Sequence, residues 1–131
     1  MSKKLPSYRE KQRILYIDHR SERDLIAYGD AFLEAGKISD AIEFYQKANY
    51  TAGLEKIRDI AEESGDVMLF QQVLKPLKQT VSDDAWNEIG KRALDKKKYA
   101  FALHAFGNGN NITMVEQIKK IMMSQENEQI A

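Results

Sequence analysis

The stretch that decides the fold is Leu25 to Ala48, LIAYGDAFLEAGKISDAIEFYQKA, because its pattern returns at Trp86 to Gly109 as WNEIGKRALDKKKYAFALHAFGNG. With a shift of 61 residues, eight of 41 ungapped positions are identical, and Gly29 falls on Gly90. Each copy has the apolar spacing of two short amphipathic helices joined by a tight turn. Such a hairpin leaves an apolar face uncovered unless a neighbour packs on it, so the sequence predicts a stacked helical array.

The composition is that of a soluble helical protein. Of the 131 residues, 43% are apolar, 31% are charged and only two are proline. Cysteine is absent, so a disulfide framework is excluded. The N-terminus has charge without the apolar segment of a signal peptide, and no stretch approaches the roughly 20 apolar residues that a membrane span requires. We therefore expect a cytoplasmic protein with no membrane partner.

Helix start and stop signals divide the chain into successive elements of a single domain, residues 1–131. Side chains that can cap a helix stand at Ser21, Ser39, Asp66 and Ser82. Pro76 should end or kink the helix that contains it. The expected elements are an N-terminal helix over 6–19, a first hairpin over 22–50, a degenerate middle hairpin over 52–80, a second clear hairpin over 83–107, a C-terminal helix over 112–124 and a flexible tail over 125–131. This gives about seven helices, and the helix over 99–106 should be the most buried because it is apolar on most sides.

The two copies share a pattern of large, small and ring side chains. The first copy has Leu25-x2-Tyr28-Gly29-x2-Phe32, then Ala41-x3-Tyr45 and Ala48, and the second has Trp86-x2-Ile89-Gly90-x2-Ala93, then Ala102-x3-Phe106 and Gly109. This pattern resembles the tetratricopeptide-repeat (TPR) family. The resemblance implies an all-α fold, an α-α superhelix built as a right-handed array of antiparallel hairpins. The proline that commonly closes the family's unit is replaced by Gly53 and Met114, and the middle hairpin follows the pattern poorly.

The resemblance also implies a binding surface. In that family the first helix of each hairpin lines a concave groove that binds a peptide or partner protein, as a scaffold or adaptor does. The groove-facing positions would be Arg23, Ile26, Asp30 and Glu34 in the first hairpin and Asn87, Lys91 and Asp95 in the second. These side chains mix both charges with few apolar anchors, which favours a polar or charged peptide. They are equally compatible with an ordinary solvated face.

The sequence gives no sign of catalysis. It contains no nucleophile motif, Walker loop, dinucleotide fingerprint or zinc-type spacing. His19 and His104 lack a ligand partner at metal-binding spacing, and residues 107–111, GNGNN, are typical of a helix-ending turn. We therefore expect no catalytic, cofactor-binding or metal-binding residue, and a protein that is not an enzyme.

Two other kinds of partner stay open. The net charge is zero, but residues 1–23 hold seven basic and three acidic side chains. RNA or another polyanion could bind the basic side chains of this segment and of one lysine run, namely Lys3, Lys4, Arg9, Lys11, Arg13 and Lys96 to Lys98. An exposed end of the array could instead pair with a second copy of the chain, giving a homo-oligomer.

Overall fold

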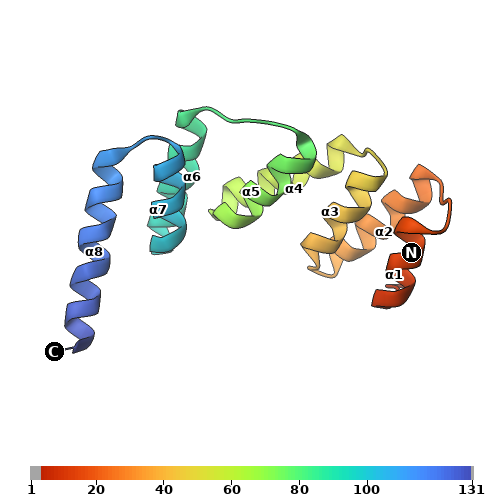
Figure 1. The fold of residues 1–131 in the computed structure, drawn as a ribbon, viewed down its shortest axis with the longest axis horizontal. Coiled ribbons are helices and arrows are strands. Elements are labelled where there is room, and N and C mark those ends of the chain that lie inside the picture. The colour runs from red at the N-terminus through yellow and green to blue at the C-terminus, as the bar shows by residue number, and fades with distance from the viewer. Residues whose placement is uncertain (1–3, 131) are drawn as a thin grey trace. The chain divides into compact units, whose positions relative to one another are not determined.

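The computed structural model describes residues 4–130, with side chains from 4 to 128, and this part of the chain is all-α, as expected. Its eight helices are α1 (Tyr8–Tyr16), α2 (Glu22–Glu34), α3 (Ile38–Lys47), α4 (Thr51–Ser64), α5 (Val67–Leu77), α6 (Asp83–Asp95), α7 (Tyr99–Asn108) and α8 (Ile112–Ile130) (Figure 1). Neighbouring helices pack in pairs, most extensively α2 with α3 and α6 with α7.

The chain forms two compact units, Met1–Ile57 and Arg58–Ala131, so the boundary between them falls within α4. The first unit contains α1, α2 and α3, and the second contains α5, α6, α7 and α8. The single domain over 1–131 and the superhelical winding of the hairpins stay predictions.

The 61-residue repeat is visible in the helix boundaries. Both ends of α2 and α6 differ by 61 residues, and so do both ends of α3 and α7. The caps follow the same shift, because the Ser21 side chain accepts a hydrogen bond from Asp24 N and the Ser82 side chain accepts one from Ala85 N. After each hairpin the chain turns through a left-handed asparagine, Asn49 (φ 53°) or Asn110 (φ 56°). Local sequence therefore sets the same hairpin twice.

The two repeat glycines lie in equivalent surroundings. A Cβ placed on Gly29 would meet the Tyr45 ring, with its nearest atom at 2.5 Å, and a Cβ on Gly90 would meet the Phe106 ring at 3.1 Å. Each ring comes from the second helix of the same hairpin. The absence of a side chain at these positions lets an aromatic ring lie flat against the facing helix.

Rings fill the core of the first unit. Phe44 is completely buried, and its ring centroid lies 5.4 Å from that of Phe32 and 5.5 Å from that of Tyr28. Helix α1 covers this hairpin through Ile14 and Leu15, which are both buried. Apolar burial therefore fixes α1 on the α2–α3 pair.

In the second unit, α5 packs on α6 and α7, and α8 packs on α7. The Phe70 ring contacts the Trp86 ring edge-on at 5.2 Å. Gly65 (φ +68°) begins the turn into α5, where an added Cβ would lie only 2.9 Å from Ala93 N. As expected, α5 ends next to Pro76, and Lys78 follows in the left-handed region.

Several element boundaries differ from the expectation. Helix α1 begins after Ser7, which forms a capping box with Glu10, and it is shorter than 6–19. The N-cap of α3 is Lys37 rather than Ser39. Helix α8 runs to Ile130, so the tail expected to be flexible over 125–131 is helical up to that residue. Ala131 lies outside the described residues.

The composition of α7 predicted that it would be the most buried helix, and this prediction is wrong. Only Ala102, Ala105 and Phe106 are buried in α7, whereas five residues of α5 are buried. The turned-out side of α7 carries exposed Ala100 and His104. Helix α7 therefore has an apolar composition on more sides than its neighbours cover.

Candidate partner-binding surface

The four positions named on α2 follow helical spacing, so they lie along one side of that helix. Arg23, Asp30 and Glu34 are exposed, and Ile26 is half-buried. The Asp30 carboxylate accepts a hydrogen bond from the Tyr45 hydroxyl at 2.5 Å. Burial, and then this hydrogen bond, raise the pKa of the Tyr45 phenol above its usual value. Asp30 thus holds the ring that covers Gly29, in addition to any role at the surface.

The three positions named on α6 do not share one environment. The Asn87 side chain points toward the end of α7, where its Nδ2 donates to the Gly109 carbonyl at 3.3 Å and its Oδ1 is buried with no hydrogen-bond partner among the described residues. Lys91 and Asp95 are exposed. Asn87 therefore contacts the inside of its own hairpin, whereas Asp95 lines a hollow.

That hollow lies between the second half of α4 and the end of α6, and its volume is about 470 Å³. It is lined by six charged side chains, namely Asp59, Glu62, Glu63, Arg92, Asp95 and Lys96. We call these six residues the acidic hollow, because four carboxylates face two cations there.

Both cations of the acidic hollow already have contacts. Lys96 Nζ donates to the Ser64 carbonyl at 2.8 Å, and Arg92 Nε lies 3.9 Å from a carboxylate oxygen of Glu88. Glu63 and Asp95 form no ion pair within the described part of the chain. The acidic hollow therefore has carboxylates available for a cationic ligand, and a small molecule would find little apolar surface there.

Sequence reasoning found Asp95 but missed the three carboxylates of α4. The acidic side of α4 is visible in the sequence, where Asp59, Glu62 and Glu63 follow one another at short spacing. The sequence does not show that these carboxylates lie opposite Asp95, because the two helices are distant in the chain. The signal that could have found them is the position of α4 between the first helices of the two clear hairpins.

The basic N-terminal segment offers fewer free cations than its composition suggests. Lys11 is only 6% exposed, and its Nζ contacts Asp40 at 2.6 Å and Glu43 at 2.7 Å. Burial alone would lower the pKa of Lys11, but the hydrogen bonds to both carboxylates raise it by more, so the net shift is upward. Lys11 therefore fastens α1 to α3. Lys3 lies outside the described residues.

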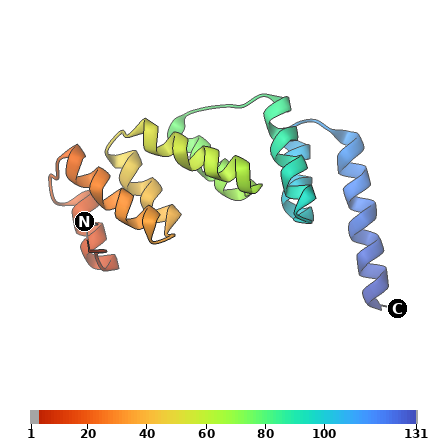
Figure 2. The same ribbon diagram turned by 180° about the vertical axis from the view of Figure 1, so that it is seen from behind.

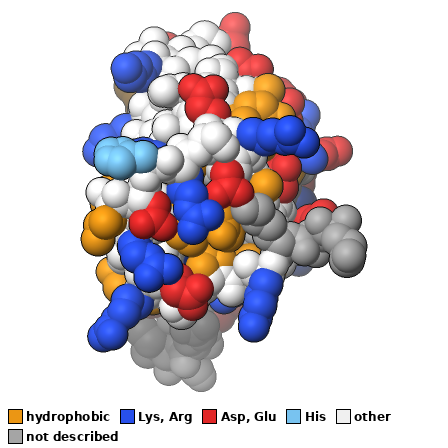
Figure 3. Space-filling model, turned by 90° about the vertical axis from the view of Figure 1, so that its right-hand side faces the viewer, with side chains coloured by type: hydrophobic (Ala, Val, Ile, Leu, Met, Phe, Trp, Pro, Cys, Tyr) orange, Lys and Arg blue, Asp and Glu red, His pale blue; other side chains and the backbone are white. Residues whose placement is uncertain are grey.

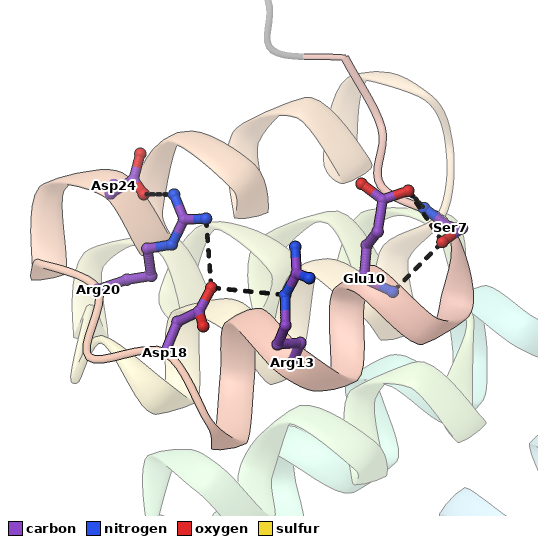
Figure 4. A network of polar contacts seen from close by, with 6 residues as sticks. All are labelled: Ser7, Glu10, Arg13, Asp18, Arg20 and Asp24. Carbon is purple, nitrogen blue, oxygen red and sulfur yellow. Dashed lines mark hydrogen bonds and ion pairs between the residues drawn. The ribbon is translucent and has the colours of Figure 1, made fainter.

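Two arginines of the first unit are also paired. Figure 4 shows Arg13 and Arg20 on either side of Asp18, with Arg20 bonded to Asp24 as well. The Arg20 guanidinium lies 3.3 Å from Asp18 Oδ2 and 2.9 Å from Asp24 Oδ2, and Arg13 Nε lies 3.8 Å from Asp18 Oδ2. Of the cations named for polyanion binding in this unit, only Lys4 and Arg9 are exposed without a contact of this kind among the described residues.

No helix of residues 4–130 combines the length and the apolar character needed to cross a membrane. Over the same residues, no group of three or more His, Asp or Glu side chains is arranged to hold a metal ion. Comparisons with protein-family models, curated proteins and solved structures found no match.

Proposed function

We propose that this chain is a protein-interaction module with a TPR-like array, and that the acidic hollow binds a basic peptide segment of a partner protein. The observation that carries the proposal is the acidic hollow itself, in which Glu63 and Asp95 carry carboxylates without an ion pair in the described part of the chain. Lysine and arginine side chains are the groups that such a surface attracts.

The repeat supports this assignment of function. In a TPR-like array the first helices of successive hairpins face the same groove. Here α2 and α6 are first helices by the 61-residue shift, and α4 stands between them in the chain. The acidic hollow joins α4 and α6, which is where the resemblance would place the groove. That the hairpins form a TPR-like array with a groove is itself part of this proposal.

The expected binding is weak and sensitive to salt. The carboxylates are solvent-exposed, and each exposed ion pair contributes about 0.2–1 kcal/mol. Screening over about 10 Å at 0.1 M salt reduces such attraction further. A short peptide rich in lysine and arginine that pairs with all four carboxylates gains at most about 4 kcal/mol, so it should bind with a dissociation constant of about 1 mM or weaker at low salt, and more weakly as salt rises.

Fluorescence anisotropy with labelled peptides tests the proposal. We expect a Lys/Arg-rich peptide to bind and an acidic peptide of equal length not to bind. The double variant Glu63→Lys with Asp95→Lys should weaken binding about tenfold or more. The matched control, Glu22→Lys with Glu116→Lys, changes the net charge equally at exposed carboxylates of α2 and α8 and should leave binding within about twofold.

Equal weakening in both double variants would show that only net charge matters, and it would refute the acidic hollow as a site. An RNA oligonucleotide that binds more tightly than the basic peptide, with affinity falling as salt rises, would instead favour the polyanion alternative.

A further inference from the structure

Exposed apolar side chains concentrate on the first and last helices. Among the described residues, the large hydrophobic side chains that are exposed are Tyr8, Tyr16, Ile17, Met68, Ile112, Ile121 and Met123. All but Met68 belong to α1, to the residue that follows it, or to α8. Figure 3 looks at the end of the first unit that carries α1, where hydrophobic side chains surface among charged ones. Apolar surface gathered on two elements indicates surfaces that a partner covers.

Helix α1 has the place in the first unit that α5 has in the second, since each precedes a repeat hairpin. Helix α1 contacts α3 through Lys11, and α5 packs on α6 and α7. When the buried residues Lys11, Ile14 and Leu15 are matched with Phe70, Val73 and Leu74, Tyr8 falls on Val67. Tyr8 is 76% exposed, whereas Val67 is completely buried. A hollow of about 730 Å³ runs along the same side of α1, from Ser7 to Ile17. Helix α1 therefore lacks a neighbour that α5 has.

Helix α8 is the counterpart of α4 by the 61-residue shift, and both start at equivalent positions. Ile118 is completely buried, as is its counterpart Ile57. Met122 is half-buried, whereas its counterpart Ala61 is completely buried, and the next residue, Met123, is 62% exposed. The side of α8 that continues past Ile118 therefore lacks the cover that α4 has.

Within the chain, the second half of α4 and α5 are neighbours. Only Gly65 and Asp66 separate the two helices, and the ribbons lie side by side in both views (Figures 1 and 2). Arg58 Nη1 also donates to Gln79 Oε1, just beyond α5, at 2.5 Å. In this antiparallel pair Ala61 of α4 and Val67 of α5 are both completely buried, whereas their counterparts Met122 of α8 and Tyr8 of α1 are half-buried and exposed.

We infer that α8 of one copy packs antiparallel against α1 of a second copy, completing the pair that α4 and α5 form within the chain. The charges fit this direction. The end of α8 carries exposed Glu126 and Glu128, and the segment at the start of α1 carries exposed Lys4 and Arg9. An antiparallel pair brings these two ends together, so acidic side chains meet basic ones.

The contact is heterologous, because two different surfaces meet. Each copy keeps one free α1 and one free α8, so copies add head to tail without closing unless the rotation forms a ring. A junction of two helices is small, so the association is weak and grows with concentration. The inference does not depend on the acidic hollow.

Sedimentation analysis of the full chain tests this inference. The front variant is Tyr8→Glu with Ile17→Glu, and the tail variant is Ile121→Glu with Met122→Glu. The control is Met68→Glu, which places one such negative charge on an exposed apolar residue of α5. Circular dichroism establishes that each variant keeps its helices before its mass is measured.

We expect the average mass of the unmodified chain to rise above 15.1 kDa as the protein concentration increases from about 10 µM to about 1 mM. The control variant should show the same rise in mass. Front and tail variants should each stay monomeric. Their equimolar mixture should form a species of twice the monomer mass and nothing larger, because one intact α8 and one intact α1 remain.

Three outcomes would overturn the inference. The unmodified chain could stay monomeric over the whole range. Either folded variant could still associate alone, which would indicate pairing of like ends. The mixture of the two folded variants could remain monomeric.

Discussion

Replacing Gly29 by alanine tests the close contact on which each repeat hairpin depends. In a helix interior the change from glycine to alanine by itself stabilises by about 0.5–1 kcal/mol. Here the new Cβ would lie 2.5 Å and 2.7 Å from two ring carbons of Tyr45, where carbon atoms normally keep about 3.5–4.0 Å. The overlap is therefore about 1 Å, and the ring must move.

Tyr45 has little freedom to move. It is 1% exposed, its hydroxyl is bonded to Asp30, and its ring lies edge-on to Tyr50 at 5.3 Å. Overpacking costs about 1–3 kcal/mol, and losing the hydroxyl bond would add about 1 kcal/mol. After subtraction of the helix-propensity gain, we expect Gly29→Ala to lower the free energy of unfolding by about 1–3 kcal/mol.

Two matched glycines make the test specific. At Gly90 the Phe106 ring lies at 3.1 Å and has no hydroxyl bond, so a shift of a few tenths of an ångström suffices, and Gly90→Ala should stay within about 1 kcal/mol of the unmodified chain. At Gly107 nothing lies within 4 Å of an added Cβ, so Gly107→Ala should stabilise slightly, by up to about 1 kcal/mol. Urea unfolding followed by circular dichroism measures all three. If Gly29→Ala proves as stable as Gly107→Ala, the reasoning from close helix contact is wrong.

Two further substitutions test the polar contacts of the first unit. Lys11→Met keeps the apolar stem but removes the ammonium that contacts Asp40 and Glu43. Because both carboxylates can regain water, we expect the free energy of unfolding to fall by about 1–2 kcal/mol, with faster amide hydrogen exchange in α1. Unchanged exchange in α1 would contradict the anchoring role of Lys11. Tyr45→Phe tests the pH dependence: the folded protein holds the phenol proton more tightly than the unfolded chain, so this contribution is complete below the unfolded pKa of about 10 and is lost as pH rises above it. The unmodified chain should therefore lose more stability between about pH 9 and pH 11 than Tyr45→Phe does, and parallel pH profiles would exclude Tyr45 as the cause.

The positions of the repeat hairpins follow from the sequence because local physics sets them. The Ser21 and Ser82 caps use backbone donors three residues away, and Asn49 and Asn110 adopt the left-handed turn that asparagine tolerates. Such contacts span only a few residues, so they can be predicted from the sequence alone. The match between Gly29 and Gly90 belongs to the same class, since the ring that covers each glycine comes from the next helix along the chain.

The candidate site could be predicted only in part, because it depends on helices that are distant in sequence. Helical spacing placed Asp95 on a surface, but the carboxylates opposite it come from α4, about 30 residues earlier. Asn87 has the spacing of a groove residue, yet its amide is drawn inward by the Gly109 carbonyl. Periodicity gives the side of a helix, and the neighbouring helix decides whether that side is open.

The sequence alone determined the helical class, the hairpin boundaries and the repeat, since these arise from apolar spacing and from capping within one or two turns. Only the tertiary structure decided that Lys11 is buried between two carboxylates, that α7 keeps an exposed side, and that α1 and α8 carry uncovered apolar residues. Burial and ion pairing are properties of what approaches a side chain from elsewhere in the chain, and a helix has the same periodicity whether its neighbour is present or absent.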